Sequence, residues 1–371
     1  MKNSLQSLVG VSALAFLFVA MPVMAAVDTT GENVDTGPNS ENENEFEISN
    51  TPDTNVTNQG HINEQANVDA DTGFNDQNGN TSAGDQESGG VDASTEWDNV
   101  LNSGMALVAG DGEFDISSDF TNDTTGPNSE NENELEVRND IDTTLRNLAR
   151  VLNSLRLDAD TGFNDQNGNT NAGSQTTGGV EGMFGISNMA NNDSGLIGYS
   201  GLVISADAIN DTTGPFSENE NETEVRNDVT TNVTNRANLR TRVRVDADTG
   251  HNDQNGNTNA GSQSTGDVAV TTDIVNSANN GSGLADAGSG LEVTSDFTND
   301  TTGPNSDNEN ELEVRNDVDT TVRNNADVNN NVNVDADTGF NDQNGNTNAG
   351  SQSTGAVSVN LNSTTEVNNS N

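Results

Sequence analysis

The sequence predicts an all-β fold, a β-solenoid built from repeats, with loop-like or disordered segments between them. Three observations lead to this prediction. One unit recurs four times along the chain, short stretches alternate between polar and apolar residues, and Asn-Gly pairs stand at the same place in every unit. Regular spacing of this kind is typical of stacked repeat architectures, alternation with period two is typical of strands, and Asn-Gly favours tight turns.

The first 26 residues have the features of a secretory signal peptide. Lys2 precedes an apolar stretch over residues 8–23, and the small residues Ala25 and Ala26 suit a signal peptidase. A membrane anchor is the alternative, but the stretch is short for a span and ends in a cleavage-like site. We therefore expect cleavage near Ala25 or Ala26, and a secreted or cell-surface mature chain with no membrane span.

The composition excludes several classes of partner. The 371 residues carry a formal net charge of −48, only 29% of them are hydrophobic, and there is no cysteine, which excludes disulfides. The single lysine, Lys2, lies in the predicted leader, so we expect no nucleic-acid partner, because such partners need basic patches. Low hydrophobicity with high charge is also typical of disorder, which keeps a disordered acidic polymer open as an alternative.

Two glycines mark each repeated unit. The first glycine recurs after 89, 88 and 89 residues, and so does the second. The two sets are Gly37, Gly126, Gly214 and Gly303, and Gly73, Gly162, Gly250 and Gly339. This spacing places repeats at 27–89, 119–177, 208–265 and 296–355, variable segments at 90–118, 178–207 and 266–295, and a tail at 356–371.

A shorter spacing suggests the length of one coil. Thr302, Thr320 and Thr338 are separated by 18 residues each, and Val314 and Val332 share that spacing. We infer from these residues a rung of about 18 residues, which is a plausible coil for a β-solenoid.

Alternating residues predict strands with a thin apolar inner face. Residues 130–137 place four glutamates on one face, and Asn131, Asn133, Leu135 and Val137 on the other. Inward asparagines in stacked coils can form amide hydrogen-bond ladders, so we expect Asn131 and Asn133 to do so.

Two further segments need a decision between conformations. Residues 141–155 carry apolar residues at helical spacing, but the equivalent residues of the other units are rich in asparagine and β-branched side chains, which favours a strand. Residues 357–361 alternate between apolar and polar, which predicts a short closing strand in the tail.

An acidic loop near the second glycine of each unit has the ligands that calcium prefers. Calcium takes roughly six to eight oxygen ligands from carboxylates, amides and carbonyls. The loops resemble the acidic calcium-binding loops of secreted repeat proteins, but depart from the EF-hand, because the glycine is fifth and no glutamate closes the loop at position twelve. The alternative is a solvated acidic turn without metal. The candidate Ca²⁺ ligands are Asp69, Asp71, Asn75, Asp76, Asp158, Asp160, Asn164, Asp165, Asp246, Asp248, Asn252, Asp253, Asp335, Asp337, Asn341 and Asp342.

Residues 343–352 resemble the curlin repeats of bacterial amyloid fibres. Gln343, Gly345 and Asn348 have the Gln-x-Gly-x-x-Asn spacing of that family, whereas the following alanine and second glutamine come earlier than in curlins. This resemblance, which covers about ten residues per unit, implies a fibre-forming β-solenoid at the cell surface.

No motif for catalysis stands out. His251 occupies the place that Phe74, Phe163 and Phe340 hold in the other units, and His61 has no counterpart. We therefore expect a non-enzymatic structural component of the cell surface, extracellular matrix or a fibre, able to self-associate and stabilised by calcium. The alternatives are an adhesin that binds through the variable segments, around Trp97 and Tyr199, and a disordered acidic ion-binding polymer.

Overall fold

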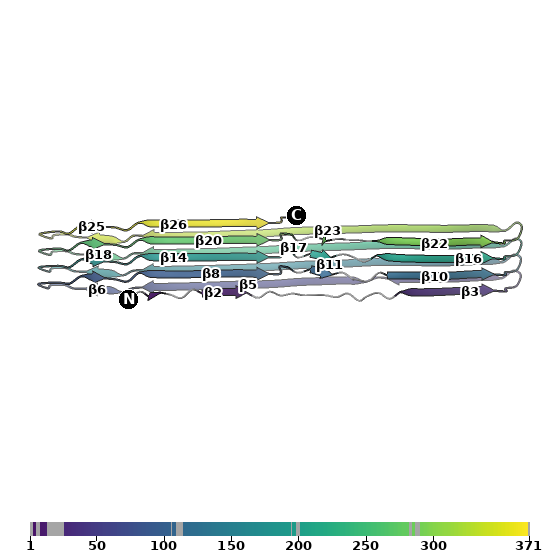
Figure 1. The fold of residues 1–371 in the computed structure, drawn as a ribbon, viewed down its shortest axis with the longest axis horizontal. Helices are drawn as coiled ribbons and strands as arrows, with labels where there is room; N and C mark the ends of the chain where they lie inside the picture. The colour runs from purple at the N-terminus through teal and green to yellow at the C-terminus, as the bar shows by residue number, and fades with distance from the viewer. Residues whose placement is uncertain are drawn as a thin grey trace.

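The computed structural model describes residues 3–4, 8–12, 26–104, 106–108, 114–193, 195–197, 201–281, 284–285 and 290–369. These residues form strands, turns and connecting segments with no helix among them, in stacked parallel sheets (Figure 1). The predicted all-β class is confirmed, and the stacking fits the predicted β-solenoid. In this part of the chain no helix has the length and apolarity needed to cross a membrane.

Each coil of the stack is one whole repeat with its variable segment. Coil 1 contains β3 (Val27–Val34), β4 (Glu41–Asn50), β5 (Asp53–Asp71), β6 (Phe74–Asp76), β7 (Gln86–Glu87), β8 (Val91–Leu101) and β9 (Ala106–Val108). Coil 2 contains β10 (Phe114–Asp123), β11 (Glu130–Asp160), β12 (Phe163–Asp165), β13 (Gln175–Thr176), β14 (Val180–Ala190) and β15 (Gly195–Ile197). Coil 3 contains β16 (Leu202–Asp211), β17 (Glu218–Asp248), β18 (His251–Asp253), β19 (Gln263–Ser264), β20 (Val268–Ala278) and β21 (Leu284–Ala285). Coil 4 contains β22 (Leu291–Asp300), β23 (Asp307–Asp337), β24 (Phe340–Asp342), β25 (Gln352–Ser353) and β26 (Val357–Val367).

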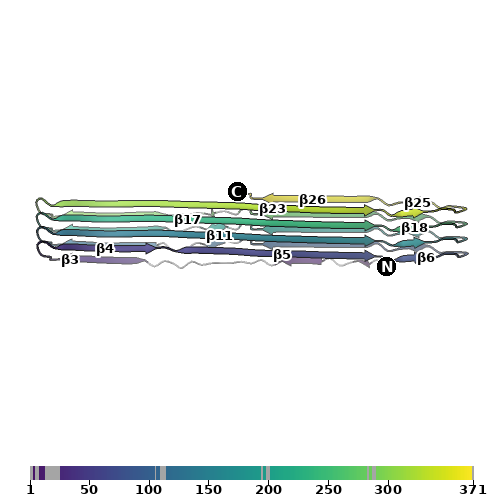
Figure 2. The same cartoon turned by 180° about the vertical axis from the view of Figure 1, so that it is seen from behind.

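The coils stack in parallel, and equivalent residues lie side by side. Glu130 pairs with Glu218 at the start of β11 and Asp160 pairs with Asp248 at its end, so the register holds over the full strand. Figure 2 shows these long strands stacked on one side of the molecule. Only coil 1 divides the long strand, into β4 and β5, at Pro52, which lacks a backbone N–H.

The predicted 18-residue rung is wrong, because one coil is a complete repeat of 88 or 89 residues. Thr320 lies within β23, whereas Thr302 and Thr338 lie in the connections before and after that strand, so these three threonines do not stack. Val314 and Val332 lie on the same face of one strand. Side chains of an extended strand alternate between faces, so an even spacing such as 18 marks one face of a strand rather than the length of a coil.

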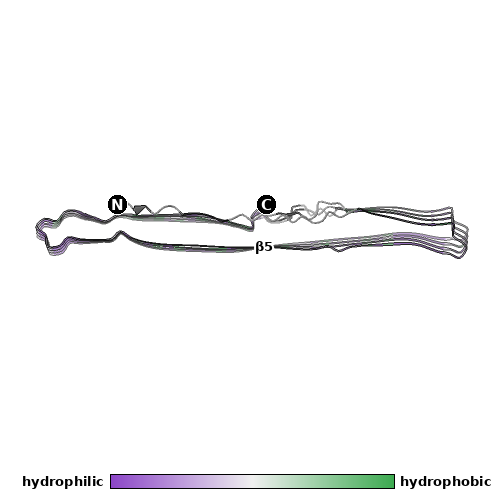
Figure 3. Cartoon of the chain, turned by 90° about the horizontal axis from the view of Figure 1, so that it is seen from below, coloured by the Kyte–Doolittle hydropathy of each residue, from purple (hydrophilic) through white to green (hydrophobic). Residues whose placement is uncertain are grey.

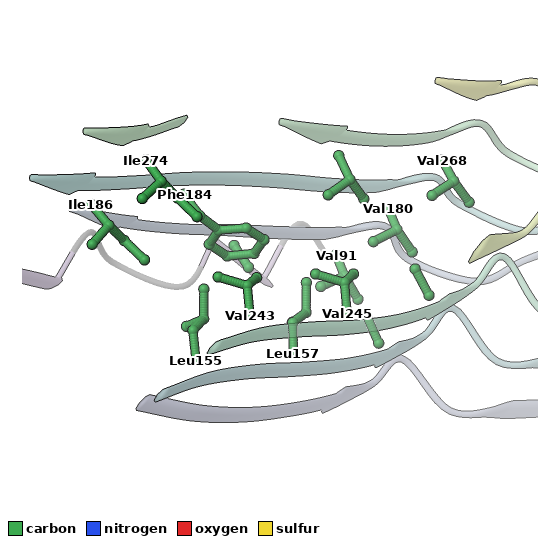
Figure 4. Packing of buried hydrophobic residues seen from close by; sticks show 14 of the residues in the cluster. Val91, Leu155, Leu157, Val180, Phe184, Ile186, Val243, Val245, Val268 and Ile274 are labelled. Carbon is green, nitrogen blue, oxygen red and sulfur yellow. The ribbon is translucent and has the colours of Figure 1, made fainter. Parts of the chain in front are cut away.

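Two layers of strands enclose a narrow interior. Viewed along the stack, the long strands form one layer, and the strands before and after them in each coil form the other (Figure 3). Apolar residues of the two layers meet in separate clusters. Figure 4 shows the largest cluster, in which Leu155 and Leu157 of β11 face Phe184 and Ile186 of β14. A second cluster joins Leu135 and other residues of the first part of β11 to β10 and β16.

The variable segments contribute strands to this interior. Val91, Val180, Val268 and Val357 pair in one register, as their spacing predicts. Trp97 is 1% exposed and lies in the largest cluster. The expectation of loop-like or disordered segments is therefore wrong for the strands β8, β10, β14, β16, β20 and β22, which wholly or partly occupy these segments. Tyr199 and Ala25 lie outside the described residues.

The two uncertain segments are both strands. Residues 141–155 belong to β11, with Ile141, Leu145 and Leu155 buried and Leu148 facing outward, so the preference for a strand is confirmed. The predicted closing strand is confirmed as β26, which is longer than expected.

Candidate functional site

Columns of identical side chains run through the stack. Because the coils are in register, each position of the repeat recurs in the next coil, one strand spacing of about 4.8 Å away. The columns fall into four kinds: buried amides, outward carboxylates, outward arginines, and one row of rings. Any function of the described surface depends on these columns, because they repeat in every coil.

Buried asparagines form the predicted amide ladders. Asn44 donates from Nδ2 to Oδ1 of Asn133 at 2.8 Å, Asn133 donates to Asn221 at 2.9 Å, and Asn221 donates to Asn310 at 2.9 Å. The column through Asn131 has the same form, with 2.7, 2.8 and 2.7 Å. Asn133 and Asn221 are 0% exposed. The expectation for Asn131 and Asn133 is confirmed.

Glutamine columns run in the opposite direction. Gln175 donates from Nε2 to Oε1 of Gln86 at 2.9 Å, and Gln263 donates to Gln175 at 3.0 Å. The asparagines thus donate toward the C-terminal end of the stack, whereas the glutamines donate toward the N-terminal end. A second glutamine column, through Gln166 and Gln254, follows the same direction. The glutamine columns were not anticipated from the sequence, although equal spacing of Gln77, Gln166, Gln254 and Gln343 was available to reveal one of them.

These ladders explain how a chain with little apolar content can bury many polar side chains in its interior. A buried amide without partners costs about 1–3 kcal/mol, whereas a satisfied hydrogen bond contributes about 0.5–1.5 kcal/mol. In an in-register stack an amide can bond to its counterpart in the next coil, so one repeated choice of residue provides partners along a whole column.

The predicted calcium ligands lie in four separate columns. Asp158 pairs in register with Asp69 and Asp246, at the end of the long strands. Asp160 Oδ1 accepts a hydrogen bond from the backbone N–H of Gly162 at 2.8 Å, and Asp71, Asp248 and Asp337 do the same with Gly73, Gly250 and Gly339.

The other two columns of predicted ligands are engaged in the protein's own hydrogen bonds. Asn164 donates to Asn252 at 2.9 Å inside the stack, so the asparagines form a ladder rather than the wall of a loop. Asp165, Asp253 and Asp342 accept from the asparagine two residues later. Among the described residues no group of three or more carboxylate, imidazole or thiolate side chains is arranged to hold a metal ion. Calcium binding stays a prediction.

Carboxylates on the outer face of the long strands are close to carboxylates of the next coil. Partial burial raises the pKa of Glu132 above its ordinary value of 4.5, and the charges of Glu220 and Glu43 raise it further. The pKa of Glu222 is raised in the same way, first by burial and then by Glu220 and Glu311. Stacking therefore forces like charges together, and cations near these rows stabilise them.

Eight of the arginines lie on the same outer face, in the second half of the long strands. They are Arg146, Arg150 and Arg156 on β11, Arg236, Arg240, Arg242 and Arg244 on β17, and Arg323 on β23. Some form ion pairs within one strand, such as Arg156 with Asp158 at 3.0 Å, and Arg240 reaches Asp327 of the next coil at 3.8 Å. These pairs are about half exposed and contribute little to stability.

One row of rings runs in the stacking direction, along the edge of the molecule formed by β6, β12, β18 and β24. Phe74 stacks on Phe163 with ring centroids 5.0 Å apart, Phe163 stacks on His251 at 4.9 Å, and His251 stacks on Phe340 at 5.0 Å. The terminal rings of Phe74 and Phe340 are about 60% exposed, at opposite ends of the row. His251 thus takes the structural place of a phenylalanine.

No family model matches this chain, and neither a curated protein nor a solved structure matches it. The function must therefore be inferred from the columns themselves and from the surfaces where they end.

Proposed function

We propose that this chain is an exported, acidic β-solenoid that assembles end to end into a fibre of the cell surface or extracellular matrix. The observation that carries the proposal is that the two ends of the stack are complementary to each other. The columns that end in coil 4 of one copy can therefore continue in coil 1 of a second copy, which would add its four coils to the stack.

Apolar side chains are left uncovered at the C-terminal end. Val314 is 43% exposed, whereas its equivalents Val137 and Val225 in coils 2 and 3 are 0% exposed. Val359 of β26 is 42% exposed, whereas its equivalent Val270 is 1% exposed. A further coil would cover them as coil 3 covers coil 2. The same apolar burial that holds the coils together would then favour assembly.

Hydrogen-bonding groups at the two ends also match. Asn310 accepts from Asn221 and is the last amide of its column, so its position calls for an acceptor in a following coil. Asn44 begins the same column and donates into the stack, so its Oδ1 can accept from a preceding coil. The glutamine columns offer the reverse pair, and the exposed ring of Phe340 can stack on Phe74 of the next copy.

All five strands of coil 4 have a counterpart at the N-terminal end. β22, β23, β24 and β25 would pair with β3, with β4 and β5, with β6, and with β7, and β26 would pair with β8. In the chain with its leader, β8 pairs with β1 (Asn3–Ser4) and β2 (Leu8–Ser12). Removal of the predicted leader would open this edge, so export would allow assembly. Open edges of parallel strands are templates for such pairing.

Electron microscopy of the purified mature chain, residues 27–371, tests this proposal. We expect fibres with a meridional repeat near 4.8 Å, and surface labelling of intact producing cells by antibody. A mature chain that folds but stays monomeric would overturn the proposed assembly, and a chain confined to the cytoplasm would overturn the proposed location.

A matched pair of proline variants separates edge pairing from misfolding. The N–H of Val268 donates to coil 4 at Ala356, and the N–H of Asn368 donates back to coil 3 at Ala278, both at 2.9 Å. Successive N–H groups point to opposite neighbours, so the N–H of Val359 faces the open edge and that of Asn360 faces coil 3. Val359→Pro should therefore fold and stop fibre growth, whereas Asn360→Pro should destabilise coil 4 itself.

A further inference from the structure

The outward face of the long strands is divided into an acidic and a basic zone. On β17 the acidic zone contains Glu220, Glu222 and Glu224, and the basic zone contains Arg240, Arg242 and Arg244. All six alternate with buried residues, so they project from the same face. This face is the outer side of one layer, and within the described residues no strand lies over it (Figures 2 and 3).

The two zones mirror each other about Asn232. At four pairs of outward positions on β17, residues at equal distances on the two sides of Asn232 carry opposite charges. The mirrored pairs on β17 are Glu224 and Arg240, Glu222 and Arg242, Glu220 and Arg244, and Asp228 and Arg236. The pairs are much too far apart to meet within one chain, since residues of a strand are about 3.3 Å apart along its length.

We propose that a second copy of this chain binds this face through a twofold axis that lies over Asn232 and runs along the stacking direction. Such an axis reverses the strand direction and therefore brings Glu220, Glu222 and Glu224 of one copy opposite arginines of the other. It also keeps the direction of stacking, so two laterally paired stacks can both extend at the same end. A twofold contact of this kind uses the same surface on both copies.

Coils 2 and 4 follow the same relation at two pairs each, whereas coil 1 contains no arginine. The axis passes Thr144 of β11 and Thr321 of β23, which pair in register with Asn232. On β11 it places Glu132 opposite Arg156, and Asp142 opposite Arg146. On β23 it places Arg315 opposite Asp327, and Asp319 opposite Arg323. Where coil 4 has no arginine, it has amides, so Glu311 faces Asn331.

Five positions do not match. Arg138 faces Arg150, and acidic residues near the two ends of the long strands face each other in every coil, so each of these pairs brings like charges together. The acidic pairs are Glu41 and Asp69, Glu130 and Asp158, Glu218 and Asp246, and Asp307 and Asp335. The complementary pairs outnumber them, and each pair occurs twice in a twofold contact. The face measures about 100 Å by 19 Å from strand spacings, which exceeds the roughly 800 Å² per partner of a standard interface.

A shallow hollow in the basic zone supports this arrangement. Gln65, Ser154, Arg156, Arg242 and Arg244 are among the residues that line it. The proposed axis places Glu134 of the second copy opposite Ser154 and Glu222 opposite Arg242, so two carboxylates point toward this hollow. Both carboxyl groups have raised pKa values from burial and from neighbouring glutamates, and guanidinium groups would relieve that repulsion.

Sedimentation of the end-blocked Val359→Pro chain tests lateral pairing apart from fibre growth. We expect a dimer at low salt and a monomer at about 1 M salt, where the screening length is about 3 Å. Arg242→Glu should raise the dissociation constant about 100-fold, because it places like charges together twice in the dimer. Arg226→Glu is the matched control, with the same charge change on the same face opposite the neutral Asn238, and it should leave the dimer largely intact.

Mixing variants gives the decisive result. Glu222→Arg and Arg242→Glu should each be monomeric alone, yet an equimolar mixture should form a heterodimer, because both opposed pairs at positions 222 and 242 are again of opposite sign. A mixture that stays monomeric while both variants are folded by circular dichroism would overturn the proposal. An end-blocked parent chain that is monomeric at low salt would also overturn the proposal. The same holds if that monomer binds an added sulfated polymer through its arginines instead of a second copy. Neither result bears on end-to-end growth, which the unblocked chain reports.

Discussion

Asn133 Nδ2 donates to Asn221 Oδ1 at 2.9 Å across 88 residues of sequence. The bond exists because each coil is one full repeat, so the partner of a residue is its own counterpart in the next coil. The consequence is that a single substitution in one coil interrupts a column that passes through all four coils.

Loss of one buried amide should therefore be costly. Asn221→Ala removes the buried hydrogen bonds that its side chain makes with Asn133, Asn210 and Asn310, so we expect a loss of about 2–4 kcal/mol in the free energy of unfolding. Denaturant unfolding followed by circular dichroism measures this. Asn232→Ala, at an exposed position of the same strand, is the control and should change stability by less than about 0.5 kcal/mol. Equal effects at both positions would contradict a structural role for the ladders.

The glycine after each acidic pair should resist substitution for a measurable reason. Gly250 has φ of +80°, and a Cβ atom there would lie 1.9 Å from the carbonyl oxygen of Gly162. Gly250→Ala should thus force the two coils apart and cost more than the roughly 1–2 kcal/mol of a left-handed residue alone. Gly256→Ala is the matched control, because Gly256 has φ of +70° but no atom near its Cβ position. Equal melting temperatures for the two variants would show that the coils are not in close contact here.

Stability should increase on mild acidification. Folding raises the pKa of Glu132, Glu134 and Glu222 above the ordinary value of 4.5. A group whose pKa is raised in the folded state contributes stability below its unfolded pKa, and loses that contribution as the pH rises through the folded pKa. We expect the free energy of unfolding of the mature chain to rise as the pH falls from about 7 toward 4.5.

A triple variant isolates these groups from the general acidity of the chain. Glu132→Gln, Glu134→Gln and Glu222→Gln together should reduce the dependence of stability on pH, since the neutral amides do not titrate. Exposed Glu87, Glu96 and Glu366, replaced by Gln in the same number, provide the control. Stability that falls steadily on acidification over this range would contradict the proposed repulsion between coils.

Calcium should act on the same carboxylate columns. Columns such as Asp69, Asp158, Asp246 and Asp335 bring like charges together at each strand spacing, and a divalent cation neutralises two of them at once. We expect millimolar Ca²⁺ to raise the melting temperature of the mature chain more than Na⁺ of equal ionic strength, and a chelator to reverse the gain. An identical response to both salts would mean that Ca²⁺ acts only by screening, and would contradict the predicted stabilisation by calcium.

Much of the fold could be predicted because repetition reveals which residues are equivalent. The spacing of the glycines and the alternation around Asn131 were sufficient for parallel strands and amide ladders. The coil length could not be obtained in the same way, because within a long strand every even spacing appears as a repeat. The place of Trp97 in a variable segment suggests a surface contact, whereas the structure shows it to be a core residue. Differences in sequence between coils show only that equivalent residues in a column need not be identical. They do not indicate whether the side chains are exposed or buried.

The calcium ligands show a different limit. Asp71 and Asn75 are close in sequence, which favoured a single cage, but the strand after Gly73 sends Asn75 into the interior and leaves Asp71 at the turn. Local spacing predicts which residues are near one another, whereas the direction of each side chain depends on the register with the neighbouring coil.

The row of rings permits the last test, because one coil departs from the pattern. His251 stacks between Phe163 and Phe340, and replaces a phenylalanine whose ring would bury more apolar area. His251→Phe should complete the row and raise the free energy of unfolding by about 0.5–1.5 kcal/mol, the usual contribution of an added aromatic pair. His61→Phe, at an exposed position of β5 outside the row, provides the matched control.

The row also ends in open rings at both ends of the stack. If Phe340 of one copy stacks on Phe74 of the next, His251→Phe should also lower the concentration at which the mature chain forms fibres. If the free energy of unfolding rises but the concentration for fibre formation does not change, the row of rings stabilises the single stack without contributing to assembly. The contact between copies would then lie elsewhere on their ends.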